Sequence, residues 1–497
     1  MRTLTGFKRR HRSVGAASAF SATIAGLSRV LVLAVALGGF AAPNALAQSL
    51  AESLAAAYTY NPQIEAERAR LRATDENVAR AMSGYRPTIS SQLSAAVQNT
   101  NTDPSSPGDG TSRPRSFAIT LTQPIFSGFR TVNAVSEAEA NVRAGQQSLR
   151  SIESSVLQAA ATAYVDVVRD EAILQLREAN LAFLQRELQA TQDRFSVGEV
   201  TRTDVAQARA RQSAAAAAID LARANLASSR AAFRRIVGSE PRRLVPPSLP
   251  HHVLPKSLAE ATDIGLQQNP SLVRALYLEQ AARFSVDQIF GELLPSAQLE
   301  ASYSATRDPT PLTDRREQGS ITGRINIPLY EAGETRARLR QSKHVHVSRI
   351  QEIELVRTEV REQVVRAWSL VQAFRAQLQS ARAQVEANQI ALDGVREEER
   401  VGQRTLLEVL NARQELLDSQ VQLTTTQRDI VVSAYQLLAA IGRLDAETYG
   451  VSGTIYDPDA HYHQVRREWW RISITDREGR RDSYDLWDDV GRHHVYK

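Results

Sequence analysis

The chain of 497 residues contains no cysteine, which excludes disulfides, zinc–thiolate sites, thiol catalysis and a lipid-modified N-terminal cysteine. It also lacks an excess of basic charge once its first 47 residues are set aside. Those residues hold six Lys and Arg and no acid, so the remainder carries 54 basic against 55 acidic residues. A basic nucleic-acid footprint is therefore excluded for the body of the protein, and no nucleic-acid partner is expected.

Signatures of common enzyme classes are missing as well. The sequence has no G-x-S-x-G, no phosphate-binding G-x-x-x-x-G-K-[ST] and no H-E-x-x-H. Histidines are few: His344 and His346 would face different ways on a helix, and His461 and His463 lie in the C-terminal tail. We therefore expect no enzymatic activity, no resident metal and no cofactor.

The first 47 residues have the pattern of a secretory signal peptide. A basic segment precedes an apolar stretch of eleven residues, 30–40, and then Ala45-Leu46-Ala47, a small-x-small cleavage signal. Such a stretch is too short to span a bilayer, which takes about 20 residues. No later stretch reaches 18 uncharged apolar residues. We expect export and cleavage between Ala47 and Gln48; the alternative is a short membrane anchor.

Proline is absent from two stretches of more than 110 residues, 125–240 and 329–457. Because proline breaks helix interiors and both stretches are rich in helix-forming residues, they favour long helices. The first would run from about residue 131 to 195, roughly 100 Å. Apolar residues recur every seven positions, which predicts coiled-coil packing. They are Val364, Val371, Leu378, Val385 and Leu392, then Val360, Ala367, Phe374 and Ala381, and finally Val409, Leu416, Leu423, Ile430 and Leu437.

The chain contains an internal repeat with an offset of 204 to 208 residues. Asn61-Pro62 returns as Asn269-Pro270, and Pro124-Ile-Phe returns as Pro328-Leu-Tyr. Val197-Gly198-x-x-Thr201-x-x-Asp204-Val205 returns as Val401-Gly402-x-x-Thr405-x-x-Glu408-Val409. We therefore predict two structural repeats, 48–240 and 263–450, joined by a linker at 241–262 and followed by a tail at 451–497.

Each repeat contains two segments in which apolar and polar residues alternate, as in strands with one apolar and one polar face. They are residues 88–98 and 116–122 in the first repeat, and 297–305 and 321–327 in the second. Their connections, 99–115 and 306–319, are rich in Pro, Asp, Ser and Thr and are expected to be exposed loops.

These strands have two interpretations. They could form a small soluble sheet packed on the helices, or they could be transmembrane strands, which need about 9–11 residues each. Four strands cannot close a barrel, and an open sheet edge inside lipid is forbidden, so the second interpretation requires several chains. Export, strand length and the regular alternation favour the transmembrane interpretation.

In their order and duplication, these landmarks resemble those of the TolC family of outer-membrane channels, over residues 48 to about 444. The resemblance is carried by the Asn-Pro motifs, the Pro124-Ile-Phe-Ser-Gly and Pro328-Leu-Tyr-Glu-Ala-Gly turns, and the two Val-Gly turns. It implies a mainly α-helical chain that forms a homotrimer in the outer membrane of a Gram-negative bacterium. Four transmembrane strands per chain would build a 12-stranded β-barrel, which contacts outer-membrane lipid and continues into a periplasmic α-helical barrel.

The same resemblance implies partners: a periplasmic adaptor and an inner-membrane ABC exporter or efflux pump. Within the family the sequence looks most like the outer-membrane component of type I protein secretion systems, a passive exit duct. That subtype rests on the general look of the sequence and on the stretch DPDAHYHQV in the tail. Two alternatives remain: the channel of a tripartite small-molecule efflux pump, and an exported coiled-coil adaptor without a pore.

The candidate site residues concentrate in the two Val-Gly turns. Gly198 and Gly402 can end a helix in the left-handed conformation, and Thr201 and Thr405 can cap the next one. By itself this is only a well-made helix-turn-helix. The resemblance adds that both turns lie at the periplasmic tip, where the adaptor docks. It thereby assigns a docking role to Gly198, Thr201, Val205, Gly402, Thr405 and Val409.

The resemblance also places the closed channel aperture at these turns. It assigns the aperture to Arg404, Glu408, Asn411 and Asp204, with Glu408 as an acidic ring that selects cations. Asn411 and Glu399 depart from the acid and the tyrosine usual in the family, so the closing network would differ in detail. The tail, 451–497, is aromatic and highly charged without a helical period, and could wrap the helices or bind a partner.

Overall fold

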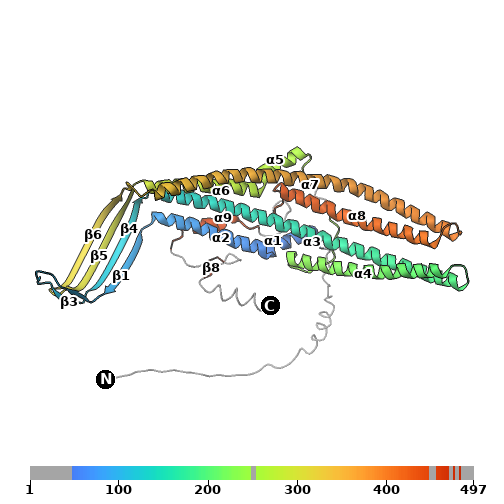
Figure 1. Ribbon diagram of the computed structural model, residues 1–497, viewed down its shortest axis with the longest axis horizontal. Coiled ribbons are helices and arrows are strands. Elements are labelled where there is room, and N and C mark those ends of the chain that lie inside the picture. Colours follow the sequence, from blue (N-terminus) through green and yellow to red (C-terminus); the bar gives the residue numbers. More distant parts are fainter. Residues whose placement is uncertain (1–47, 248–252, 447–454, 470–473, 476–480, 483–497) are drawn as a thin grey trace, which may run out of the picture. The chain divides into compact units, whose positions relative to one another are not determined.

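The computed structural model describes residues 48–247, 253–446, 455–469, 474–475 and 481–482 (Figure 1). The expected signal peptide, including Ala47, lies outside the described residues, and so does most of the chain after residue 469. Within the described part, no helix is both long enough and apolar enough to cross a bilayer.

Two successive sets of elements share one order. The first set is α1 (Leu50–Tyr60), α2 (Pro62–Met82), a 3-10 turn (Ser83–Tyr85), strands β1 (Thr88–Ala95) and β4 (Arg115–Phe126), α3 (Arg130–Ser196) and α4 (Arg202–Val237). The second set is α5 (Leu258–Gln268), α6 (Pro270–Phe290), a 3-10 turn (Gly291–Leu293), β5 (Ser296–Thr310), β6 (Thr313–Asn326), α7 (Glu334–Arg400) and α8 (Leu406–Ala440). The long helices predicted from the proline-free stretches are confirmed. Helix α5 begins inside the stretch assigned to the linker.

The Asn-Pro motifs begin α2 and α6 and anchor them. The side-chain oxygen of Asn61 accepts the N–H of Gln63 at 2.9 Å, and proline occupies the first helical position. The Asn61 amide also donates to the carbonyl of Ile236, at the end of α4, at 3.0 Å. Asn269 repeats this arrangement with the carbonyl of Ala440, at the end of α8, at 2.9 Å. Each motif therefore ties the start of a short helix to the end of a long hairpin.

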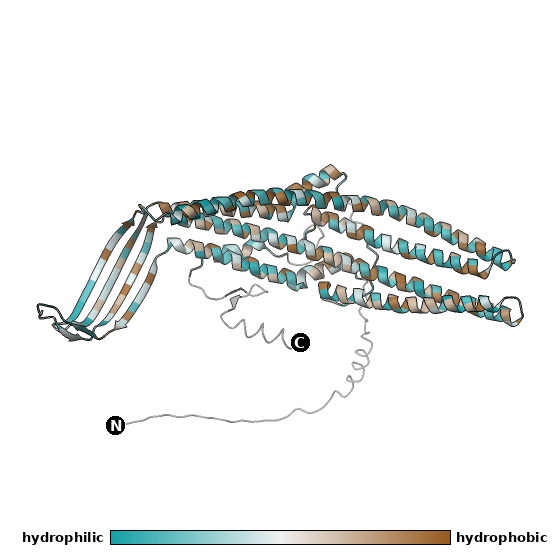
Figure 2. Cartoon of the chain, in the orientation of Figure 1, coloured by the Kyte–Doolittle hydropathy of each residue, from teal (hydrophilic) through white to brown (hydrophobic). Residues whose placement is uncertain are grey.

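The four longer strands form one antiparallel sheet in the order β1-β4-β5-β6 (Figure 1). Residues opposite one another share a face, as Ser91, Ile119, Tyr303 and Gly319 do across the sheet. The large apolar side chains lie on this face and are exposed in the single chain: Ile89, Leu93, Phe117, Ile119, Leu299, Tyr303, Ile321 and Ile325. Apolar and polar residues alternate along β1, β4, most of β5 and residues 320–326 of β6 (Figure 2), as lipid on one side and water on the other require.

The two connections predicted as exposed loops contain strand. In 99–115, β2 (Gln98–Thr100) pairs with β3 (Gly110–Ser112). In 306–319 the prediction was wrong for most of the stretch, because β5 and β6 continue to a turn of two residues. An antiparallel ladder is held by backbone hydrogen bonds, so polar side chains do not end it. The strand predicted over 88–98 is shorter, with β1 ending at Ala95, and Ile327 lies beyond the end of β6.

The predicted seven-residue stripes are buried between helices. On α7 the buried members are Val360, Val364, Ala367, Val371, Ala381 and Leu392. The first four belong to a core that extends over α1, α3, α4 and α8, in which Tyr164 of α3 packs against Phe233 of α4. Leu392 belongs to a separate cluster with Val409 and Leu416 of α8. The hydroxyl of the buried Tyr164 accepts the N–H of Val245 at 3.0 Å. The long helices are therefore stabilised by packing along one face and by links to the segment after α4.

Glu153 of α3 is a largely buried carboxyl, with its side chain 13% exposed. Burial raises the pKa of Glu153 to about 7, and Asp445 adds to this effect, while Arg68 of α2, with Nη2 3.7 Å from Oε1, opposes it. Between about pH 4.5 and pH 7 the folded state therefore holds a proton that the unfolded state has lost. This contribution to stability is fully present below a pH of about 4.5 and is lost as the pH rises through about 7.

We expect Glu153→Gln to raise the free energy of unfolding of the detergent-extracted protein at pH 8 by about 1–3 kcal/mol, because the amide stays neutral. The melting temperature at pH 8 should rise accordingly. At pH 5 the substitution should change little. The melting temperature measured at both pH values checks this, with Glu178→Gln, an exposed glutamate on the same helix, as control. An identical pH dependence in the parent and in Glu153→Gln would contradict it.

Candidate functional site

The candidate site consists of the turns that join α3 to α4 and α7 to α8. Gly198 and Gly402 have φ of +81° and +79°, the left-handed conformation predicted for them. The N–H of Gly198 donates to the carbonyl of Phe195 at 3.0 Å, and that of Gly402 to Glu399 at 2.9 Å. A side chain at either position would strain the backbone, so the two turns are tight and equivalent.

The two threonines cap the helices that follow, as predicted. Thr201 accepts the N–H of Asp204 at 3.3 Å, and Asp204 accepts the N–H of Thr201 at 2.9 Å. Thr405 and Glu408 form the same reciprocal pair, each bond being 3.4 Å. Both acids of the predicted aperture therefore complete capping boxes, which hold their side chains at the first turn of α4 and α8.

Arg404 lies between two carboxylates of its own chain. Its Nε is 2.8 Å from Oε2 of Glu398 on α7, and its Nη1 is 2.7 Å from Oε2 of Glu408 on α8. The hydrogen bond from Arg404 and one from Thr405 lower the pKa of Glu408, so this acid is ionised at neutral pH. Arg404 thus joins the last turn of α7 to the first turn of α8 within one hairpin.

Polar contacts also join the two hairpins. Arg194 of α3 places Nη1 2.6 Å from Oε1 of Glu399 on α7. Nearby, Arg211 of α4 donates to the side-chain oxygen of Asn411 on α8 at 2.9 Å. The two residues that depart from the family pattern, Glu399 and Asn411, thus both find arginine partners on the first hairpin.

Arg194 and Arg211 are site residues that sequence reasoning missed. The sequence does contain a signal for them. At the offset of 204 between the repeats, Arg194 corresponds to Glu398 and Arg211 to Glu415, so the two repeats carry opposite charges at these positions. Arg413 of α8 adds a third contact, with its Nε 3.0 Å from the side-chain oxygen of Asn180 on α3. Burial, and then the charges of Arg186 and Arg396, lower the pKa of Arg413.

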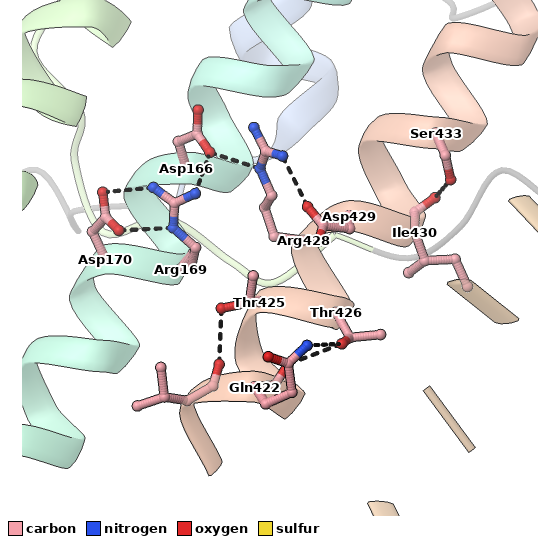
Figure 3. Close-up of polar contacts among 11 residues, drawn as sticks. Asp166, Arg169, Asp170, Gln422, Thr425, Thr426, Arg428, Asp429, Ile430 and Ser433 are labelled. Atoms are coloured by element: carbon pink, nitrogen blue, oxygen red, sulfur yellow. Dashed lines mark hydrogen bonds and ion pairs between the residues drawn. The ribbon is translucent and has the colours of Figure 1, made fainter. Parts of the chain in front are cut away.

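Away from the turns, the hairpins are joined by a larger ion network on α3 and α8 (Figure 3). Arg428 contacts Asp166 at 2.7 Å and Asp429 at 2.9 Å, while Arg169 contacts Asp166 at 3.0 Å and Asp170 at 2.8 Å. This region is part of the main apolar core, whereas the turns rest on a small cluster that includes Leu184, Leu406 and Leu410. The turns therefore have fewer stabilising contacts than the rest of the hairpins.

The predicted docking residues differ in accessibility. Val409 is 1% exposed, because it packs against Leu392 and Leu416 inside the α7–α8 hairpin. It supports the turn from within and presents little surface to a partner. Val197 and Val401, each just before a turn glycine, are 77% and 69% exposed.

The described residues contain no group of three or more side chains with the composition of a metal site. His461 instead contacts a carboxylate, with Nδ1 2.8 Å from Oδ2 of Asp75. His346 similarly lies 2.6 Å from Glu279.

Known proteins resemble this chain over most of its length. The model of the family described as outer membrane efflux protein matches residues 54–239 and 263–443. The outer membrane efflux protein BepC of Brucella suis is 39% identical over 434 residues, which cover 87% of this chain and 93% of BepC. The outer membrane protein TolC of Vibrio cholerae is 27% identical over 418 residues, covering 81% of this chain and 92% of TolC.

The fold is also similar to that of a solved channel. The outer membrane channel CmeC of Campylobacter jejuni superposes with a TM-score of 0.72 at 15% identity, covering 84% of this chain and 89% of CmeC. The relatives are outer-membrane channel proteins rather than enzymes, which places the chain in the outer membrane as a transport protein. This chain belongs to the outer membrane efflux protein family of TolC-like channels.

Proposed function

We propose that this outer-membrane channel is the exit duct of a tripartite efflux pump for small molecules. A periplasmic adaptor would engage the two hairpin turns, and an inner-membrane pump would supply the cargo. The observation that carries the proposal is the pair of matching turns joined by few polar contacts. A partner that binds there can separate the hairpins without disturbing the core further along them. The efflux assignment is supported by the family description and by the name of BepC.

Type I protein secretion, which the sequence favoured, is the second candidate. It rested partly on the stretch at 457–465, and that stretch contacts the chain's own helices. His461 meets Asp75 of α2, and Asp459 accepts a hydrogen bond from Gln146 of α3 at 2.7 Å. These residues are explained by packing and carry no information about cargo. The alternative of an adaptor without a pore is wrong, because the family is one of outer-membrane channels.

The assembly in this proposal is a homotrimer with its aperture at the hairpin turns. Arg404, Glu408, Asp204 and Asn411 would surround the aperture, with ionised Glu408 favouring cations. The turns formed around Gly198 and Gly402 and capped by Thr201 and Thr405 would present the adaptor-docking surface. Val205 and Val409 would hold that surface in place, while the exposed Val197 and Val401 make the contact.

Deletion of the gene tests the cargo class. The deletion strain should accumulate a fluorescent dye and become sensitive to small toxic compounds, with its secreted proteins unchanged. Loss of a secreted protein with normal dye export would contradict the efflux assignment and favour type I secretion.

Substitution at the turns tests the docking surface in the same strain. Val197→Asp combined with Val401→Asp should fail to restore dye export, although the protein still reaches the membrane. The matched control is Leu221→Asp, on α4 and 61% exposed, which should restore export. Full restoration by the double variant would contradict docking at the turns.

A further inference from the structure

The tail segment 455–469, here called the C-terminal strap, lies against the first set of elements and includes a short helix, α9 (Pro458–Val465). This helix was not expected from the sequence. The strap begins beside α1, where the N–H of Tyr456 donates to the hydroxyl of Tyr58 at 3.3 Å. The guanidinium of Arg68 lies 4.7 Å from the Tyr58 ring and 4.9 Å from the Tyr456 ring, a cation–π contact with both.

The middle of the strap is held by ion pairs and hydrogen bonds. His461 contacts Asp75 of α2, whose side chain is fully buried. Arg466 and the hydroxyl of Tyr462 both donate to Oε1 of Glu139 on α3, at 2.8 and 3.1 Å. Because these contacts involve half-buried or buried groups, they fix the strap to the surface of α2 and α3 more firmly than exposed ion pairs would.

The end of the strap lies at the start of the sheet. Arg86 donates from Nη1 to the carbonyl of Glu468 at 3.0 Å and from Nη2 to the carbonyl of Arg467 at 3.3 Å. Arg86 stands two residues before β1, the first strand of the sheet that belongs in the outer membrane. The strap therefore runs in the direction of α2 and ends at the level where β1 enters lipid.

The residue at that level is Trp469, which is 71% exposed. Other exposed aromatic residues lie at the junctions between helices and strands: Tyr85, Phe126, Phe129, Phe290 and Tyr330. Aromatic side chains concentrate where a membrane protein crosses the interface between lipid and water, since the ring is amphipathic. Arg467, two residues before Trp469, is exposed and carries a charge that suits a lipid phosphate.

We propose that the end of the C-terminal strap is a membrane-interface anchor, in which Trp469 inserts among the phospholipid headgroups of the periplasmic leaflet of the outer membrane. The strap thereby fixes the height of the helical portion relative to the bilayer at a point outside the sheet. This role is independent of the cargo and of the adaptor.

Fluorescence quenching in vesicles tests the anchor. The full-length chain with Trp368, Trp470 and Trp487 changed to Phe keeps Trp469 as its only tryptophan. It is reconstituted in phosphatidylethanolamine and phosphatidylglycerol, with and without phosphatidylcholine brominated near the headgroup end of its chains. We expect the bromines to lower Trp469 emission about twofold, because an interfacial ring lies within their reach. The control keeps only Trp368, which packs against the helical core, and should be quenched much less.

A second pair of variants tests whether the hydrogen bonds from Arg86 to the strap hold Trp469 at the membrane. Arg86→Gln removes both hydrogen bonds to the strap end and should reduce the quenching of Trp469. Arg80→Gln, on α2 but not among the residues that bond the described strap, should leave it unchanged. Equal quenching of Trp469 and Trp368, or quenching that does not respond to Arg86→Gln, would overturn the proposal. So would unquenched Trp469 with the blue-shifted emission of a buried ring, which would mean that a second copy of the chain covers it.

Discussion

Replacing Glu399 by glutamine is expected to shift the channel toward its open state and to raise the time-averaged conductance in planar bilayers. Glu399 is the acid that joins the end of α7 to Arg194 of α3, at 2.6 Å, and its side chain is only 13% exposed. A charged hydrogen bond at a half-buried site contributes about 1–2 kcal/mol, which corresponds to a change of roughly 5–30-fold in the ratio of closed to open channels. Few other contacts join the two hairpins near the turns, so little else holds the channel closed.

Charge reversal and a matched control make this prediction specific. Arg194→Glu combined with Glu399→Arg should return the conductance toward that of the parent, because the pair is restored with opposite polarity. Arg400→Ser breaks an ion pair with Glu397 within α7, in which both side chains are 67% exposed, and should have little effect. If Arg400→Ser opened the channel as much as Glu399→Gln, the inter-hairpin contact would not be the one that holds it closed.

Recordings in planar bilayers also test the residues assigned to the aperture. Arg404→Ser removes the bonds to Glu398 and Glu408 and should also raise the conductance. Glu408→Gln should lower the preference for cations, since it removes the ionised group that completes the capping box at the start of α8. Unchanged selectivity in Glu408→Gln would place the constriction elsewhere along the tunnel.

Local features of the turns could be predicted from the sequence because they depend on neighbouring residues. The left-handed glycines, the capping threonines and the acids three residues later lie within one short stretch of each repeat. The same holds for the alternation along the strands and for the seven-residue stripes, since both periods follow from backbone geometry. Figure 2 shows this pattern along the helices and strands.

Contacts between distant segments could not be predicted in this way. The partners of Glu399 and Asn411 are about 200 residues away, and their pairing depends on how far one hairpin is shifted along the other. The strap contacts, such as His461 with Asp75, join residues 386 positions apart in sequence. The prediction of a loop at 306–319 was wrong for another reason. A polar composition is compatible with a loop and equally with strands that lie outside lipid.

The open edges of the sheet require further copies of the chain. Among the described strands, β1 and β6 each pair on one side only. Backbone N–H and C=O groups left unpaired in lipid cost several kcal/mol each, so neither edge can face the hydrocarbon. Pairing β6 of one copy with β1 of the next would be a head-to-tail contact, which gives a ring when the rotation between copies closes. We propose three copies, which give twelve strands and place the α3–α4 and α7–α8 hairpins around one tunnel.

Native mass spectrometry of the mature protein, extracted from membranes in detergent, tests this assembly most directly. We predict a single dominant species with the mass of three chains, each beginning at Gln48, and no folded monomer at equilibrium. The Glu399→Gln variant should give the same species, because its effect lies at the turns and not at the sheet edges. A stable monomer or dimer with intact strands would contradict the trimeric channel.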